Sequence, residues 1–202
     1  MSWFEAVPLQ NEYVRLEPLR IDHTECLFPT TDAETFRYWV TLQPRDRSLE
    51  AFQQFLKQTL ATSNCISYAV QDRRTGQWAG KTSFMDIRTE ARGVEIGMTW
   101  LAAEFRNSYL NSAMKHLMLQ HAFENRGAIR VQLKTDARNV MSARAILKLG
   151  AKDEGILRKH GIQPDGTVRD THMFSIVDDE WPEVSGRLLA RILQKVSGQA
   201  GI

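Results

Sequence analysis

The sequence predicts a single α/β domain in which a mostly antiparallel sheet contains one central, splayed parallel strand pair and is flanked by helices. Three runs between residues 66 and 101 have the composition of strands and are separated by short polar turns. From Leu110 the apolar residues take a helical spacing, and a further strand and helix follow. Because a helix joins the two central strands, we expect them to be parallel and the crossover right-handed.

The composition is that of an ordinary globular domain. The chain has 202 residues, 43% of them hydrophobic and 25% charged, with a formal net charge of +2. This balance predicts neither a nucleic-acid nor a membrane partner, and no apolar run approaches the ~20 residues of a membrane span. The two cysteines and the histidines form no metal-ligand pattern, so we expect no metal. The absence of a secretory signal pattern favours a cytoplasmic protein.

The first half of the chain contains most of the predicted strands. Residues 13–19 alternate as a strand, Asp22 is the expected N-cap of a short helix, and residues 30–47 have no period and are interpreted as irregular, as part of a substrate wall. Ser48 is expected to cap a helix whose inner face carries Leu49, Phe52, Leu56 and Leu60. A meander follows, with strands at 66–70, 78–87 and 93–101.

The second half alternates helices and strands. The helix from Leu110 ends at Gly127, and residues 128–135 form a strand with Ile129, Val131 and Leu133 on one face. A helix from Asn139 to Gly150 has Ala143, Ile146 and Leu147 inside, and strands near 154–160 and 168–177 flank a turn at 164–166.

The last segment of the chain is predicted to be helical. Pro182 opens a helix bearing Leu188, Leu189, Ile192 and Leu193, so we divide the chain into a domain at 1–182 and a helical extension at 183–202. This apolar stripe predicts packing either on its own domain or on a second subunit.

Two segments carry the candidate chemistry. A polar loop at 103–108 connects a strand to the start of a long helix, where unpaired N–H groups and partial positive charge can hold phosphates, with Arg106 adding a cation. Most such turns bind nothing. The segment from Asn139 to Ala151 is explained equally well by Asn139 as an N-cap, Ser142 as a solvated first-turn residue and Gly150 as a C-cap.

The order and separation of these segments resemble the GNAT superfamily of N-acetyltransferases, and the chain is similar to its ribosomal-protein N-terminal (RimJ/RimL-type) members. The resemblance covers about residues 12 to 182. It rests on Glu95-Ile96-Gly97, Leu101 and Arg106, on Asn139, Ser142 and Leu147-Lys148-Leu149-Gly150, and on Gly155-Ile156-Leu157-Arg158, Asp165-Gly166, Asp170 and Glu180-Trp181 in the closing segment. Because the C-terminal helix lies outside it and relatives often pair, the resemblance favours a homodimer, with packing of the helix on its own domain as the alternative.

The resemblance implies that acetyl-CoA is the co-substrate and lies between splayed strands ending at Leu101 and starting at Ala128. Backbone groups near Thr99 and Leu101 would pair with its pantetheine arm, and Asn139 would contact the arm or cap its helix. The pyrophosphate would lie over Arg106, Asn107, Ser108, Tyr109, Leu110 and Asn111. Asn107 and Tyr109 stand where relatives have glycine, so we expect the Tyr109 side chain to turn away from the phosphates.

The implied reaction is direct attack of a primary amine, from a protein N-terminus or a small molecule, on the thioester. Glu95 is the candidate base, unless it is an exposed strand glutamate paired across the sheet. Ser142 is the candidate acid for the thiolate, since Ile146 stands where many relatives have a tyrosine; His160 or His172 in the closing hairpin could also help remove the amine proton. The competing interpretation is a catalytically weak or inactive CoA-binding regulatory domain.

Overall fold

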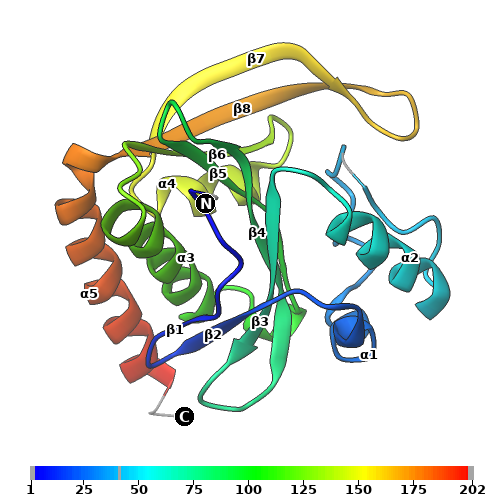
Figure 1. The fold of residues 1–202 in the computed structure, drawn as a ribbon, viewed down its shortest axis with the longest axis horizontal. Helices are drawn as coiled ribbons and strands as arrows, with labels where there is room; N and C mark the ends of the chain where they lie inside the picture. Colours follow the sequence, from blue (N-terminus) through cyan, green and yellow to red (C-terminus); the bar gives the residue numbers. More distant parts are fainter. Residues whose placement is uncertain (1–2, 41, 200–202) are drawn as a thin grey trace.

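The computed structural model describes residues 3–40 and 42–199 and contains one mixed sheet with helices on both faces (Figure 1). The sheet has eight strands in the order β1-β2-β3-β4-β5-β6-β8-β7. All neighbouring strands are antiparallel except β5 and β6. The predicted fold class, with its single parallel pair, is therefore confirmed.

The first five strands include the strand predicted at 13–19 and the predicted three-strand meander, and they begin with a short strand that was not predicted from the sequence. They are β1 (Leu9–Gln10), β2 (Val14–Pro18), β3 (Cys65–Asp72), β4 (Trp78–Arg88) and β5 (Gly93–Leu101). The turn between β3 and β4 closes as predicted, with the Gly76 N–H donating to the Asp72 carbonyl and Gly76 in the left-handed region at φ 74°.

The remaining strands extend the sheet on the far side of β5. They are β6 (Arg130–Asp136), β7 (Lys152–Ile162) and β8 (Val168–Val177). Helix α3 (Leu110–Gln120) connects β5 to β6 and continues into a π-helical turn, His121–Asn125. Strand β7 is the outer edge of the sheet, and β7 and β8 extend together as a long arm above the molecule (Figure 1).

The helices bury different apolar surfaces on the two sheet faces. On one face lie α1 (Thr24–Leu27) and α2 (Leu49–Leu60), and a cluster that includes Phe52, Phe55 and Trp100 fills this side. On the other face α3, α4 (Val140–Leu147) and α5 (Trp181–Gln199) share a larger core. We call these the α2 face and the α3 face. Single-turn 3₁₀ helices occupy Ile21–His23, Phe28–Thr30, Ala103–Phe105 and Asp178–Glu180.

Several local predictions are corrected. Asp22 is not an N-cap, because a 3₁₀ turn whose N-cap is Arg20 precedes α1. Helix α2 is capped by Ser48 as predicted, but Leu49 and Leu60 are 44% and 45% exposed, and Phe55 and Thr59 share the buried side with Phe52 and Leu56. Ile129 and Leu147 are also exposed, at 41% and 46%, while Leu149 is buried. The buried face of α2 therefore differs from the face predicted from the spacing of its leucines.

The C-terminal helix packs on its own domain. In α5 Val184, Leu188 and Ile192 are each 1% exposed and join the core with α3, whereas Leu189 and Leu193 are 45% and 56% exposed. Packing on the same domain, the alternative prediction, therefore holds for Leu188 and Ile192 but not for Leu189 and Leu193. Residues 200–202 of the predicted extension lie outside the described residues. In the described ranges, no helix has both the length and the apolar character needed to cross a membrane.

Candidate active site

A gap opens between the two parallel strands. In the described part of the chain β5 and β6 pair over three positions, with Gly93 opposite Arg130, Val94 opposite Val131 and Glu95 opposite Gln132. Beyond Glu95 both strands continue, β5 to Leu101 and β6 to Asp136, without pairing to each other. Backbone groups along this edge of β5 are therefore available to a ligand inserted between the strands.

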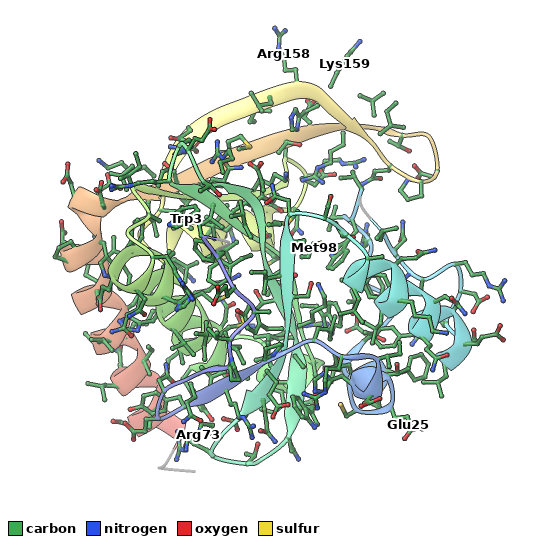
Figure 2. The ribbon with its side chains drawn as sticks, in the orientation of Figure 1. Trp3, Glu25, Arg73, Met98, Arg158 and Lys159 are labelled. Atoms are coloured by element: carbon green, nitrogen blue, oxygen red, sulfur yellow. The ribbon has the colours of Figure 1, made fainter. Side chains whose placement is uncertain are left out.

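A β-bulge shapes β5 beside the gap. The register with β4 shifts between the pairs Ser83–Gly97 and Lys81–Trp100, and Met98 takes a left-handed conformation at φ 47°. Figure 2 shows Met98 on the central strands. A bulge re-aims the backbone groups around it and is frequent next to active sites. This bulge was not predicted from the sequence.

Glu95 lies on the α2 face at the point where the strands separate. Its side chain is 2% exposed, which excludes the interpretation as an exposed glutamate. Oε2 accepts from Gln132 Nε2 at 3.1 Å and lies 3.0 Å from Lys134 Nζ. Oε1 lies only 3.0 Å from where a Cβ at Gly97 would stand, so the carboxylate rests over that glycine. Glu95 thus has both a cross-strand ion pair and a position beside the gap.

Further charged residues line the same face as Glu95. The Asp136 carboxylate accepts from Arg138 Nε at 2.9 Å and Arg138 Nη2 at 2.8 Å, and Gln163 Nε2 donates to it at 3.2 Å. Arg169 Nε lies 4.0 Å from the same carboxylate. Although burial raises the pKa of Asp136, the hydrogen bonds from Arg138 outweigh burial and hold that pKa below its usual value.

This group of residues was not predicted from the sequence. Polar side chains at Gln132, Lys134 and Asp136 alternate with Val131 and Leu133 along β6. This alternation could have indicated the site. Strand β6 has a neighbouring strand on each side, and a buried strand is otherwise apolar.

Ser142 and Asn139 lie on α4, whose inner residues pack into the α3-face core. Asn139 Oδ1 accepts from the Ser142 N–H at 3.0 Å, which confirms Asn139 as the N-cap of this helix. Ser142 is half-buried, and within residues 3–40 and 42–199 its hydroxyl makes no hydrogen bond. Glu95 and Ser142 therefore stand on opposite faces of the sheet, with the gap between them.

The loop before α3 accommodates Asn107 and Tyr109 at the two positions where relatives have glycine. Asn107 adopts φ 61°, a conformation in which asparagine replaces glycine most readily. The Tyr109 side chain turns away from the loop as predicted: it is buried, and its hydroxyl donates to Asp72 Oδ1 at 2.6 Å. Burial, followed by the Asp72 hydrogen bond, raises the Tyr109 pKa. Ser108 Oγ accepts from the Leu110 N–H at 3.1 Å.

Two cations flank this loop. Arg106 Nη2 pairs with Asp32 at 2.7 Å, and its Nε donates to the Leu101 carbonyl at 3.0 Å. Lys195 from α5 donates to the carbonyls of Asn107 and Ser108, the latter at 2.9 Å. The Asn111 backbone N–H belongs to the first turn of α3, where helices leave N–H groups without partners of their own. The loop therefore keeps a backbone surface suited to an anion.

Thr99 and Leu101 on β5 were predicted to contact the cofactor through their backbone groups. Thr99 Oγ1 points to the α3 face, where it shares a hydrogen bond with Thr82 at 2.8 Å and accepts from Lys115 Nζ at 2.9 Å. Burial lowers the pKa of Lys115 to about 7. Since the Thr99 side chain is engaged and the Leu101 carbonyl accepts from Arg106, only the remaining backbone groups of these residues can serve a ligand.

The two histidines of the closing hairpin have different partners. His160 Nδ1 lies 3.1 Å from Thr171 Oγ1, and Thr171 faces the same side as Asp136, its partner in the register. His172 Nε2 lies 2.8 Å from Asp153 and packs against Phe174. Only His160 is thereby directed toward the α2 face.

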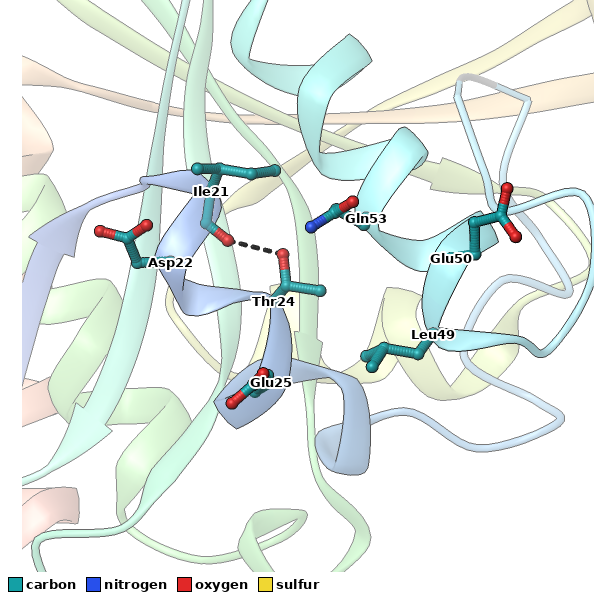
Figure 3. Close-up of a pocket in the computed structure, with 7 residues that line it drawn as sticks. All are labelled: Ile21, Asp22, Thr24, Glu25, Leu49, Glu50 and Gln53. Carbon is teal, nitrogen blue, oxygen red and sulfur yellow. Dashed lines mark hydrogen bonds between the residues drawn. The ribbon is translucent and has the colours of Figure 1, made fainter.

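Two surface cavities lie outside the gap. One, of about 410 Å³, is formed by α1 and α2 and is lined by none of the predicted site residues (Figure 3). The other, of about 280 Å³, lies between the turn 163–165 and a set of residues from 33–39 together with Gln43, and its lining includes Phe36, Trp39 and Gln163. Through Gln163 this second cavity adjoins Asp136.

Comparison with known proteins identifies one family. The model of the acetyltransferase (GNAT) domain matches residues 14–152. The chain is 29% identical over 112 residues to the uncharacterized N-acetyltransferase YoaA of Bacillus subtilis, a match covering 55% of this chain and 62% of that relative. It thus spans less than two thirds of that protein.

Solved structures agree on the fold. A putative acetyltransferase from T. thermophilus superposes with a TM-score of 0.87 at 36% identity, over 94% of this chain and 99% of that one. Mycobacterium smegmatis RimJ, determined in complex with CoA-disulfide, superposes with a TM-score of 0.72 at 19% identity, over 92% and 93% of the two chains.

Proposed function

The chain belongs to the acetyltransferase (GNAT) domain family, and we propose that it transfers an acetyl group from acetyl-CoA to a primary amine by direct attack. The observation that carries this proposal is the unpaired gap between β5 and β6, with buried Glu95 on one face and Ser142 on the other. GNAT enzymes use acyl-CoA donors and amine acceptors. The acceptor class, a peptide N-terminus or a small-molecule amine, is part of the proposal.

The cofactor would lie with its pyrophosphate over residues 106–111 and its pantetheine arm along β5 near Thr99 and Leu101. Burial of the Tyr109 side chain in the core supports this placement, because no bulky ring then covers the backbone of the loop. Asn139 serves as the N-cap and would border the arm. Arg106, held by Asp32, would add positive charge at the edge.

Acetyl-CoA is expected to stabilise the folded protein measurably. A ligand that binds only the native state at 100 times its Kd adds about 2.7 kcal/mol to the free energy of unfolding. We expect a rise in Tm at saturating acetyl-CoA, together with calorimetric binding. An unchanged Tm and no heat of binding would contradict the placement over 106–111. Lys195→Met removes the side chain that donates to the carbonyls of Asn107 and Ser108. The Tm shift of this variant with acetyl-CoA tests whether the conformation of the loop matters for binding.

In the proposed reaction the amine nitrogen forms a bond to the thioester carbon and the carbon–sulfur bond breaks. Glu95 would accept the amine proton, directly or through a water, while Lys134 and Gln132 hold its carboxylate in place. A backbone N–H near the Met98 bulge would stabilise the developing oxyanion. Ser142 would protonate the departing thiolate from the opposite face.

Ser142→Ala is expected to slow thiolate release by less than about 10²-fold, because a serine hydroxyl is a weak acid and water can partly replace it. The loss should shrink when the acetyl donor carries a more acidic thiol that needs no protonation. Steady-state rates with acetyl-CoA and with such a thioester measure this difference. Equal losses with both donors would remove Ser142 from the acid role and leave it a positioning residue.

The alternative function is a CoA-binding regulatory domain with weak or no turnover. Asn107 in place of glycine and Ile146 in place of a tyrosine motivate it. Thiol release measured with a panel of amines, together with CoA binding, separates the two: binding without release supports the regulatory domain.

A homodimer and a cytoplasmic location are also proposed. Leu189 and Leu193 are the large apolar residues that α5 leaves exposed, so they are the surface that this helix offers to a second copy. Light scattering gives the molecular mass that decides between monomer and dimer.

A further inference from the structure

Arg169 is a buried guanidinium without a matched partner. It lies on β8 opposite Gly161, and its side chain is 7% exposed. Within the described residues its Nε makes no hydrogen bond. The nearest carboxylate oxygen, on Asp136, is 4.0 Å away, which is beyond hydrogen-bond distance. A buried charge whose ion-pair partner is too far away for a hydrogen bond is costly, so its retention calls for an explanation.

The surrounding charges do not balance Arg169. On this face the carboxylate of Glu95 is paired with Lys134 at 3.0 Å, and that of Asp136 with Arg138 at 2.8 Å. Each carboxylate thus already has a cation of its own, and Arg169 is the third cation beside two anions. These five side chains, two anionic and three cationic, together carry one surplus positive charge. Burial lowers the pKa of Arg169, with Asp136 and then Glu95 opposing that shift and Arg138 adding to it.

The strand register puts this surplus charge on the same face as the candidate base. Glu95 pairs with Gln132, and Gln132 shares its face of β6 with Asp136. Asp136 pairs with Thr171, two residues from Arg169 on β8. The cavity of about 280 Å³ adjoins this row through Gln163, which donates to Asp136. An amine at Glu95 therefore has a buried, unmatched guanidinium on the same side of the sheet.

We propose that the acceptor amine carries a carboxylate and that Arg169 binds it, which rests on the proposed acetyl transfer. The carboxylate would supply the missing anion and occupy the unused Nε donor, since guanidinium and carboxylate match in geometry and charge. Arg169 then determines specificity, while Glu95 receives the proton. A free amino acid and an acidic peptide near its N-terminus both present this chemistry.

The test compares acceptors that differ only in the carboxylate. Alanine, serine and phenylalanine are assayed against their carboxamides, and a peptide with aspartate as its second residue against the same peptide with asparagine. We expect kcat/KM to favour the carboxylate by about 10-fold to 100-fold in one of these arms, the range of a charge-assisted contact. Preference in the amino-acid arm identifies a free amino acid, and preference in the peptide arm identifies an acidic peptide.

Variants of Arg169 test whether this side chain causes the preference for carboxylate acceptors. Arg169→Gln should bring the ratio of carboxylate to carboxamide toward one by raising KM for the carboxylate, and Arg169→Lys should restore part of it. Arg158→Gln is the matched control, because Arg158 is exposed on β7 and points away from the sheet (Figure 2). Its ratio should equal that of the unmodified enzyme.

The outcomes separate this inference from the proposed function. Equal transfer to both members of every pair overturns the carboxylate inference and leaves the acetyltransferase intact. If no amine is acetylated, the proposed function fails, and calorimetry of the same pairs decides the binding question: a preference for the carboxylate that Arg169→Gln removes supports the site, and no preference overturns it. Because the pairs are compared on the unmodified protein, a variant that does not fold leaves the test valid.

Discussion

Glu95→Gln is expected to lower kcat by about 10²-fold or more while affinity for acetyl-CoA stays near normal. The amide has nearly the same shape, so it fits over Gly97, but it cannot accept a proton at neutral pH. Steady-state kinetics across pH and calorimetry with acetyl-CoA measure the two effects separately.

The control for Glu95 is Asp86→Asn. Asp86 also accepts from Gln132 Nε2, at 3.1 Å, but its side chain is 45% exposed, and it lies on β4 between the residues that pair with Glu95 and Gly93 of β5. A general disturbance of Gln132 should appear in both variants, whereas loss of a base should appear only in Glu95→Gln. Unchanged turnover of Glu95→Gln at every pH would remove Glu95 from the reaction and leave positioning as the main catalytic device.

Leu188→Ala should lower the free energy of unfolding by about 2–5 kcal/mol, the usual cost of truncating a fully buried leucine. Leu188 is 1% exposed and belongs to the core shared with α3. The effect would make α5 part of the domain's folding unit, although the family match ends at residue 152. Urea denaturation at equilibrium provides the measurement.

The neighbouring residue serves as the control for Leu188. Leu189→Ala removes the same atoms from a side chain that is 45% exposed, and we expect a change within about 0.5 kcal/mol. Similar small losses in both variants would mean that α5 adds little to the stability of the domain. A loss at Leu189 that depends on protein concentration would instead indicate a subunit interface.

Strands and turns could be predicted from the sequence because their signals are local. The limits of β5 and β8 agree with the predicted 93–101 and 168–177. Helix faces were predicted less well, because Leu49 and Leu147 fit an apolar stripe yet remain exposed. The orientation of a helix depends on tertiary packing, which a periodic pattern does not contain.

The candidate site also contains features that could be predicted from the sequence and features that depend on tertiary contacts. Asn139 as an N-cap followed from residue type and spacing, because caps obey local rules. The turned-away Tyr109 followed from the family resemblance, which places it where relatives have glycine. Asp136 and Arg169 could not be connected, because they are 33 positions apart and meet only through the pairing of β6 with β8. The bulge at Met98 likewise depends on the register with β4, which no single residue specifies.

The most direct test of the central claim follows thiol release and amide formation together, with purified protein, varied acetyl-CoA and amines with and without a carboxylate. Direct attack predicts one amide formed for each thiol released, intersecting lines in the double-reciprocal plots, and no acetyl group left on the protein. Parallel lines with an acetylated protein intermediate, or CoA binding without amide formation from any amine, would contradict it.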